Sequence, residues 1–375
     1  MRRTLVVTND FPPRAGGIQS FVYGLIARRP PGSVAVYAPQ WPGSEDFDLR
    51  QPYPVVRHPT SLMLPTPAVA RRAAALIAEF GCETVVFGAA APLGLLAPRM
   101  REAGVRRVVM VTHGHEAGWT ALPIGRRVLA RIGAHADVVT YLGEYTRQRL
   151  ARVIPEDKLV RLAPGVDTEV FAPEAGREQA RAALGLGERP VVLCLSRLVP
   201  RKGQDTLLRA WPGVLRDVPD AMLLIVGGGP YRRTLERLAR PMGGSVQIIG
   251  PVPEAALPGY LAAGDVFAMP CRTRLGGIDV EGLGIVYLEA SASGLPVVAG
   301  SSGGAPDAVL RGQTGLVVDG TRPDEVTATL VDLLKDPAGA RAMGERGREW
   351  VAREWSWELA ASRFARVLES VEAPD

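Results

Sequence analysis

Short apolar runs rich in β-branched residues recur along this chain and alternate with stretches that carry apolar residues at helical spacing. The runs are apolar at consecutive positions, which is typical of strands buried on both faces of a parallel sheet. A succession of β-α-β units therefore predicts an α/β, doubly wound fold. The strands predicted in the first half are Thr4–Thr8, Val34–Ala38, Thr84–Phe87, Val108–Thr112 and Val138–Tyr141, with helices at Gln19–Arg29, Ala68–Phe80 and Arg126–Ala134.

The same pattern starts again after a stretch near residues 165–188 that is rich in turn-forming residues. A chain of 375 residues also exceeds what one hydrophobic core usually organises. We therefore expect two Rossmann-like domains, at residues 1–168 and 169–352, and a C-terminal helix at 353–375 that packs back on the first domain. The second set of predicted elements is Val191–Ser196, Met222–Val226, Val246–Ile249, Val266–Met269, Val297–Ala299, Leu316–Val318 and a long amphipathic helix from Trp350 to Val371.

The charge pattern and the cysteines limit which partners and which cellular compartment we expect for this chain. The net charge is +5, but no basic run of five residues and no interleaving of basic and aromatic residues is present, so nucleic acid is not an expected partner. A mild positive excess favours anionic small molecules or an anionic lipid surface. The first residues lack a signal-peptide core, and the three scattered cysteines predict buried thiols in a reducing cytoplasm.

Ligands of open α/β sheets bind where strands end and helices begin, so the strand exits are the first places to search. After the first predicted strand, Gly16 and Gly17 open a helix and leave backbone N–H groups that can face an anion at close range. The loop lacks the G-x-G-x-x-G spacing of a dinucleotide fingerprint. A loop that merely turns the chain is the alternative.

His113, His115 and Glu116 follow the strand that ends at Thr112. Imidazoles and a carboxylate are metal ligands, but the other two histidines lie in unrelated segments, so we expect no metal here. A structural histidine and a substrate hydrogen-bond donor remain. We favour the donor, with His113 as the better candidate because it stands directly at the strand exit.

A basic turn and two glutamates stand out in the second half. Arg197 and Lys202 flank a proline-containing turn that suits a diphosphate, with a solvated basic turn as the alternative. Glu281 and Glu289 are eight residues apart, and the glycines between them predict that Glu281 lies in a loop and Glu289 in the following helix. A loop carboxylate can bind sugar hydroxyls and a helical one a ribose diol. The glycines at 227–229 permit either close approach to a ligand or a tight strand–helix connection.

Taken together, these motifs resemble the retaining GT-B glycosyltransferases of family 4. The resemblance rests on the Gly16-Gly17 loop, the Ser196-Arg197-x4-Lys202-Gly203 turn and the Glu281-x7-Glu289 element, and it extends through essentially the whole chain. Residues 8–13 (TNDFPP), 87–92 (FGAAAP), 112–116 (THGHE) and 279–290 (DVEGLGIVYLEA) are similar to the actinobacterial branch of the family. That branch transfers an α-(1→6) mannose from GDP-mannose to phosphatidylinositol monomannoside.

The resemblance implies a GT-B architecture, in which two Rossmann-like parallel-sheet domains face each other across a cleft. It implies that Arg197 and Lys202 hold the donor diphosphate, that Glu289 holds the ribose and that Glu281 holds the donor sugar. The residues implied to act in catalysis are Glu281, His113, Arg197 and Lys202.

Further donor contacts are implied by the same resemblance. The backbone at Gly16 and Gly17 would face the phosphate, His113 would contact the sugar, and Val252 would lie near the guanine. No cofactor or metal is implied. The anomeric configuration would be retained by front-face attack, with the diphosphate itself drawing the acceptor proton.

The implied partners are GDP-mannose, a phosphatidylinositol mannoside acceptor and the anionic inner face of the cell membrane, where the protein would be peripheral. Basic surface including Arg71, Arg72, Arg126 and Arg127 would contact that membrane, with solvated arginines as the alternative. Another acceptor, such as diacylglycerol or a polysaccharide intermediate, stays open. Leu275 stands where the similar branch tends to have an all-glycine run, so the resemblance defines the acceptor contacts near residues 272–278 less closely than the donor site. From other classes, a nucleotide-binding oxidoreductase and a non-catalytic binding module also stay open.

Overall fold

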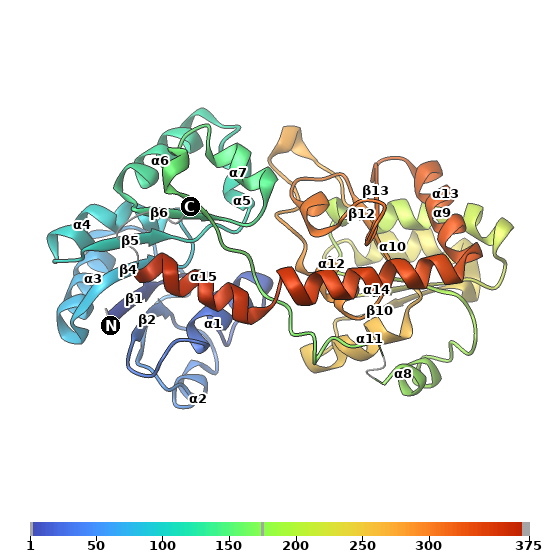
Figure 1. Cartoon of the computed structure of the whole chain (residues 1–375), viewed down its shortest axis with the longest axis horizontal. Helices are drawn as coiled ribbons and strands as arrows, with labels where there is room; N and C mark the ends of the chain where they lie inside the picture. The colour runs from blue at the N-terminus through green and yellow to red at the C-terminus, as the bar shows by residue number, and fades with distance from the viewer. Residues whose placement is uncertain (1–2, 174–175, 370–375) are drawn as a thin grey trace. The chain divides into compact units, whose positions relative to one another are not determined.

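The structure, a computed structural model, describes residues 3–173 and 176–369 and divides the chain into two compact units (Figure 1). Unit 1 contains the chain up to Gly165 together with the helix that begins at Trp357, and unit 2 runs from Val166 to Ser356. Each unit is built on its own parallel sheet. The predicted α/β class with two Rossmann-like sheets is confirmed.

Unit 1 has a seven-stranded sheet in the order β3-β2-β1-β4-β5-β6-β7. Its strands are β1 (Arg3–Val7), β2 (Val34–Pro39), β3 (Val55–His58), β4 (Cys82–Phe87), β5 (Arg107–Met110), β6 (Val138–Tyr141) and β7 (Leu159–Arg161). Its helices are α1 (Gly17–Ala27), α2 (Ser44–Asp48), α3 (Pro67–Phe80), η1 (Leu93–Leu96), α4 (Ala97–Glu102), α5 (His115–Trp119), α6 (Pro123–His135), α7 (Glu144–Leu150), η2 (Glu156–Lys158) and α15 (Trp357–Glu369).

The helices α3, α4 and α6 share one apolar core with one face of this sheet. Alternate strand residues, such as Leu5 and Met110, pack there against Leu76 of α3 and Ile132 of α6. Burying each such side chain contributes roughly 1.5–3 kcal/mol before the entropy of ordering is subtracted. This core fixes the strands whose exits carry the candidate residues of unit 1.

The last helix, α15, belongs to unit 1 although the chain reaches it from unit 2. It contacts α1 and β5. The guanidinium of Arg107 donates from Nε to the carbonyl oxygen of Val367 at 2.7 Å, and the guanidinium of Arg28 lies 4.4 Å from the ring centroid of Trp357. A Cβ at Gly24 of α1 would overlap that ring, so the absence of a side chain permits the close approach of the two helices.

Unit 2 has a six-stranded sheet in the order β10-β9-β8-β11-β12-β13. Its strands are β8 (Val191–Leu195), β9 (Met222–Val226), β10 (Val246–Ile249), β11 (Val266–Met269), β12 (Val297–Gly300) and β13 (Gly315–Val318). Its helices are α8 (Arg177–Ala183), η3 (Pro200–Lys202), α9 (Gln204–Asp217), α10 (Arg232–Ala239), η4 (Arg240–Ser245), η5 (Glu254–Ala256), α11 (Leu257–Ala263), η6 (Leu275–Gly277), α12 (Ile285–Ala292), η7 (Ala305–Ala308), α13 (Pro323–Lys335) and α14 (Pro337–Glu354).

Each sheet has a point where the strand order reverses. In unit 1 the first strand, β1, lies between β2 and β4, and in unit 2 the first strand, β8, lies between β9 and β11. Chain connections on the two sides of such a point leave in opposite directions, so the strand exits there open a crevice in which ligands of α/β sheets bind. The candidate residues of each unit are therefore sought first at the exits of these strands.

Two differences from the predicted elements have clear physical reasons. The edge strands β3 and β7 were not predicted, because they are short and half-buried and lack a continuous apolar run. The single helix predicted from Trp350 is wrong, because the chain leaves helical geometry at Trp355 (φ −131°, ψ 24°), and Ser356 pairs with Val166 in an isolated bridge. The predicted end of that helix, Val371, lies outside the described residues.

The three cysteines are free and buried, which confirms their prediction as structural thiols. Burial raises the pKa of Cys82 and of Cys271 to about 11 and that of Cys194 to about 12, so all three stay protonated at neutral pH. Within the part of the chain that the structure describes, no helix combines the length and the apolar character needed to cross a bilayer.

The α15 helix is expected to be part of the core of unit 1, which a cavity mutation tests. Phe364 is 2% exposed, so Phe364→Ala should lower the free energy of unfolding by roughly 3–5 kcal/mol. The control is Ser362→Ala, at an exposed position of the same helix. Urea unfolding followed by circular dichroism measures both; equal stability of the two variants would contradict the assignment of α15 to this core.

Candidate active site

In unit 2, the segments that follow β8 and β11 pack closely against each other. Gly203, which caps α9, has φ 78°, and a Cβ there would overlap the carbonyl oxygen of Pro270, the first residue after β11. From the β11 exit, Arg272 binds the first turn of α9, with 2.9 Å from NH1 to Oδ1 of Asp205 and 2.9 Å to Oγ1 of Thr206. The turn before α9 is thus held against the segment that follows β11.

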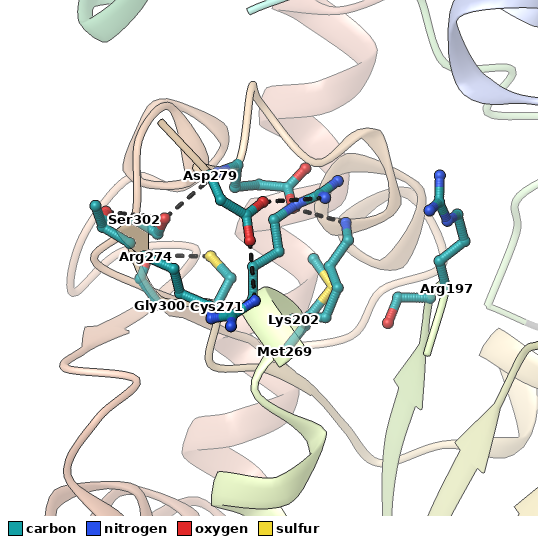
Figure 2. A network of polar contacts seen from close by, with 12 residues as sticks. Arg197, Lys202, Met269, Cys271, Arg274, Asp279, Gly300 and Ser302 are labelled. Atoms are coloured by element: carbon teal, nitrogen blue, oxygen red, sulfur yellow. Dashed lines mark hydrogen bonds and ion pairs between the residues drawn. The ribbon is translucent and has the colours of Figure 1, made fainter. Parts of the chain in front are cut away.

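This junction contains a buried ion pair. The Nζ atom of Lys202, at the end of η3, lies 2.7 Å from Oε2 of Glu281, and the two side chains are only 11% and 8% exposed (Figure 2). The backbone N–H of Lys202 donates to the carbonyl oxygen of Val199 at 3.0 Å, which fixes the turn that presents the ammonium group. Two opposite charges so little exposed to water attract each other strongly, but removing each of them from water is energetically unfavourable.

The ion pair continues into a chain of charged side chains. Nε of Arg201 lies 3.7 Å from the same Oε2 of Glu281, and its NH1 lies 3.4 Å from Oδ1 of Asp279. The other oxygen of Asp279 accepts from NH1 of Arg274 at 3.2 Å. The backbones of Arg274 and Asp279 also pair with each other, which closes the loop between them (Figure 2).

The backbone of Glu281 is held by the exit loop of β12. Gly304 donates its N–H to the carbonyl oxygen of Glu281 at 2.9 Å, and the N–H of Glu281 lies 3.4 Å from Oγ of Ser302. Gly303 has φ 56°, and a Cβ there would overlap the same carbonyl oxygen. The Glu281 carboxylate is therefore placed by three strand exits, those of β8, β11 and β12.

Arg197 stands apart from this network (Figure 2). Its side chain is exposed and makes no hydrogen bond or ion pair with any residue that the structure describes. Its backbone is fixed, because Nε2 of Gln204 donates to the carbonyl oxygen of Arg197 at 2.9 Å and to Oγ of Ser196 at 2.8 Å. An exposed cation on a fixed backbone can reach toward an anionic ligand.

The glycines after β9 have a packing role. A Cβ at Gly227 would overlap the carbonyl oxygen of Ser196, and one at Gly229 would overlap that of Leu198. Of the two interpretations of this glycine run, the geometry favours a tight connection, made here with the neighbouring β8 exit.

Glu289 lies in α12, as predicted, and Glu281 lies in the loop before it, which is also confirmed. Burial, together with the negative charge of Glu254, raises the pKa of Glu289 to about 7. Glu254 lies in the segment that follows β10, which also contains the half-buried Val252. The Glu289 carboxylate makes no hydrogen bond within the described residues, so its oxygens are available to a ligand.

In unit 1 the predicted glycines lie at the N-terminus of α1. Gly16 caps the helix, Gly17 is its first residue, and both are exposed. A Cβ at Gly17 would meet no atom within 4 Å, so the space that a side chain would occupy there is open. The loop before them is held by Gln19, whose Nε2 donates to Oδ1 of Asp10 at 2.7 Å.

His113 is buried at the exit of β5 and contacts the exit of β4. Its Nε2 lies 2.5 Å from the carbonyl oxygen of Gly88, so Nε2 carries the proton and donates it there. Burial lowers the pKa of His113, which keeps the ring neutral at pH 7. The remaining nitrogen, Nδ1, is then an acceptor, so the role of His113 toward a hydroxyl differs from the donor role expected above.

Glu116 is fully buried behind His113. Its Oε2 accepts the backbone N–H of His113 at 2.9 Å, and its Oε1 lies 3.5 Å from Nε2 of the half-exposed His115. Glu116 thus fixes the turn that carries His113. Among residues 3–173 and 176–369, no three His, Cys, Asp or Glu side chains gather as they would around a metal ion.

Of the predicted donor-site residues of unit 2, the structure brings Lys202 and Glu281 into direct contact. Arg197 lies at the β8 exit, Glu289 in the helix that follows the β11 exit and Val252 at the β10 exit, and no hydrogen bond or ion pair within the described residues joins them to this pair. Sequence reasoning missed Arg201 and Asp279, and also the Ser302–Gly304 loop. The Ser-Ser-Gly-Gly run directly after β12 was a signal for that loop, since it repeats the pattern of paired glycines at a strand exit.

Two family profiles cover most of the chain. The profile described as "Glycosyltransferase Family 4" matches residues 15–170, and the profile described as "Glycosyl transferases group 1" matches residues 176–350. A "GDP-mannose-dependent alpha-(1-6)-phosphatidylinositol monomannoside mannosyltransferase" of Mycolicibacterium smegmatis is 55% identical over 372 residues, which is 97% of each chain. A "GDP-mannose-dependent monoacylated alpha-(1-6)-phosphatidylinositol monomannoside mannosyltransferase" of Corynebacterium glutamicum is 47% identical over 375 residues, which is 98% of each chain.

Solved structures share the fold at low sequence identity. Anabaena Alr3699/HepE, in complex with UDP, superposes with a TM-score of 0.84 at 18% identity and covers 99% of this chain and 100% of its own. The sucrose-phosphate synthase of Thermosynechococcus elongatus gives a TM-score of 0.79 at 23% identity and covers 98% of each chain. Because close relatives match over the full length and both profiles match in order, the chain belongs to the family 4 glycosyltransferases with the GT-B fold.

Proposed function

We propose that this chain transfers mannose from GDP-mannose to phosphatidylinositol monomannoside and forms an α-(1→6) linkage. The activity named for relatives that are 47–55% identical over nearly the full length supports this assignment. The observation in the structure that carries it is the buried Lys202–Glu281 ion pair at the β8–β11 switch point. A nucleotide sugar joins a diphosphate to a hexose, and this pair offers a cation for the first and a carboxylate for the second.

The unit 2 residues supply complementary groups for each part of the donor. Arg197 and Lys202 neutralise the diphosphate, aided by free N–H groups at the start of α9. The Glu281 carboxylate accepts hydrogen bonds from the mannose hydroxyls, and Glu289 accepts from the ribose diol. Val252 borders the base.

The reaction makes one bond and breaks one. The acceptor hydroxyl attacks the anomeric carbon on the face from which GDP leaves, the bond from that carbon to the diphosphate oxygen breaks, and the hydroxyl proton passes to the departing diphosphate. Negative charge grows on the diphosphate in this step, so Arg197 and Lys202 stabilise the transition state more than the ground state. In unit 1, the Gly17 N–H is proposed to bind the phosphate and Nδ1 of the neutral His113 to accept from a sugar hydroxyl.

A membrane-facing surface in unit 1 supports a lipid acceptor. Ile124, at the start of α6, is 75% exposed, and Arg126 and Arg127 follow it on the surface. The start of α3 repeats this arrangement with Leu64, which is 50% exposed, and an exposed arginine pair at residues 71 and 72. Both helices cover the same face of the sheet. Apolar side chains beside cations suit the interface of an anionic membrane, so we assign the protein a peripheral place on its cytoplasmic face.

Purified protein with GDP-mannose and phosphatidylinositol monomannoside in mixed micelles tests the activity directly. Mass spectrometry and linkage analysis of the lipid are expected to show one added hexose in α-(1→6) linkage. Lys202→Ala should lower kcat by about 100-fold or more, because charge stabilisation of the leaving group is lost. The control is Arg209→Ala, since Arg209 is exposed and its partner Asp205 keeps Arg272. Transfer from UDP-sugars alone, or full activity of Lys202→Ala, would contradict the proposal.

The raised pKa of Glu289 predicts a pH-dependent stability difference. A carboxyl whose pKa rises from about 4.5 to about 7 on folding favours the folded state less as the pH increases through that window. Glu289→Gln should therefore raise Tm relative to the wild type more at pH 8 than at pH 5, and it should weaken GDP binding. Glu345→Gln, at an exposed position of α14, is the control. A Tm difference that does not change with pH would contradict the raised pKa.

The membrane surface predicts a defect specific to lipid binding. Ile124→Glu combined with Leu64→Glu should reduce co-sedimentation with phosphatidylinositol-containing vesicles at low salt, because each change places an anion at an apolar contact. GDP affinity should stay unchanged. Val170→Glu, at an exposed apolar position of unit 2, is the matched control. Vesicle binding equal to that of the wild type would contradict the assignment of this surface.

A further inference from the structure

The Glu281 carboxylate has two cationic neighbours on a single oxygen. Lys202 Nζ lies 2.7 Å from Oε2, and Arg201 Nε lies 3.7 Å from the same atom. The first is a close ion-pair contact in which Oε2 accepts no hydrogen bond from the described residues, and the second is too long for a hydrogen bond. Arg201 Nε is shielded from water and has no hydrogen-bond acceptor among the described residues. A buried N–H without an acceptor is rare in folded proteins and calls for an explanation.

Arg201 is held in this place from its other end. Its NH1 lies 3.4 Å from Oδ1 of Asp279, which is bound in turn by Arg274. The carbonyl oxygen of Arg201 accepts the N–H of Arg272 at 2.8 Å, so the backbone is fixed as well. The guanidinium cannot follow Glu281 freely, but Glu281 can approach it by a small side-chain movement.

We infer that Arg201 is a positioning residue. It replaces Lys202 as the cation paired with the Glu281 carboxylate when Lys202 binds the donor diphosphate. This inference rests on the proposed function. A carboxylate with 8% exposure cannot lose its cation without a large energetic penalty, so Lys202 alone would be retained by Glu281. With Arg201 beside the same oxygen, a shift of Glu281 of less than about 1 Å turns the 3.7 Å approach into a hydrogen bond. Lys202 is then free for the diphosphate, and Glu281 stays ionised for the sugar.

The charge balance of the cluster agrees with this role. Arg201, Lys202 and Arg274 supply three positive charges against two from Asp279 and Glu281. The surplus of one cation remains for an anionic ligand. Without Arg201 the cluster is neutral, and binding a diphosphate requires separation of an existing pair.

A double-mutant cycle on GDP affinity, measured by isothermal titration calorimetry, tests this inference. Arg201→Gln should weaken GDP binding by about tenfold, which is within the usual range of coupling between contacting residues. In a Glu281→Gln background, where no carboxylate retains Lys202, adding Arg201→Gln should change GDP affinity by less than about twofold. A merely structural role for Arg201 would weaken binding equally in both backgrounds.

Arg197→Gln is the matched control, because a direct diphosphate ligand should lose the same affinity in both backgrounds. If Arg201→Gln behaves in the same way, Arg201 binds the ligand directly or only supports the fold, and the inference is overturned. An Arg201→Gln variant with wild-type GDP affinity also overturns it. Absence of GDP binding by the wild type would contradict the proposed function itself. The titration of the wild type alone gives that result, without any variant.

Discussion

The buried ion pair between Lys202 and Glu281 is the interaction on which the rest of the candidate site depends. Its distance of 2.7 Å and its low exposure mean that each charge needs the other, since removing one partner of such a pair typically costs about 3–5 kcal/mol. The intact pair contributes little to net stability, because desolvation offsets most of the attraction. Its presence at a strand exit is therefore better explained by ligand binding than by folding. A cation and a carboxylate side by side match the two halves of a nucleotide sugar.

The fold brings the two charges together through backbone contacts that tolerate no side chain. Gly203 lies against the carbonyl oxygen of Pro270, and Gly303 lies against that of Glu281. Both glycines have positive φ, so a larger residue would be strained by conformation as well as by contact. Because β8 and β11 are neighbours although far apart in sequence, the position of Glu281 relative to Lys202 is a property of the sheet order. A substitution at either glycine is therefore expected to displace the segments that carry Lys202 and Glu281.

The strand pattern predicted the fold class and most strands of both sheets, because central parallel strands are continuously apolar. The glycines between Glu281 and Glu289 predicted correctly which glutamate lies in the loop. Arg201 was missed because its relation to Glu281 arises only when residues 272–281 fold back over η3, which no local spacing encodes. The tautomer of His113 could not be predicted from the sequence either, because the partner of its Nε2 is the carbonyl oxygen of Gly88, at the exit of another strand. Contacts between loops, unlike strands, leave no periodic signal.

The distribution of charge near the ion pair also bears on where the acceptor proton goes. A general base must be an unengaged group that can take a proton. Around Lys202, Glu281 is paired, and Asp279 and Asp205 each contact two arginines. No carboxylate of this cluster is therefore unengaged, which agrees with the proposed transfer of the acceptor proton to the diphosphate oxygen as its bond to the sugar breaks, with the cations of the cluster stabilising the leaving group.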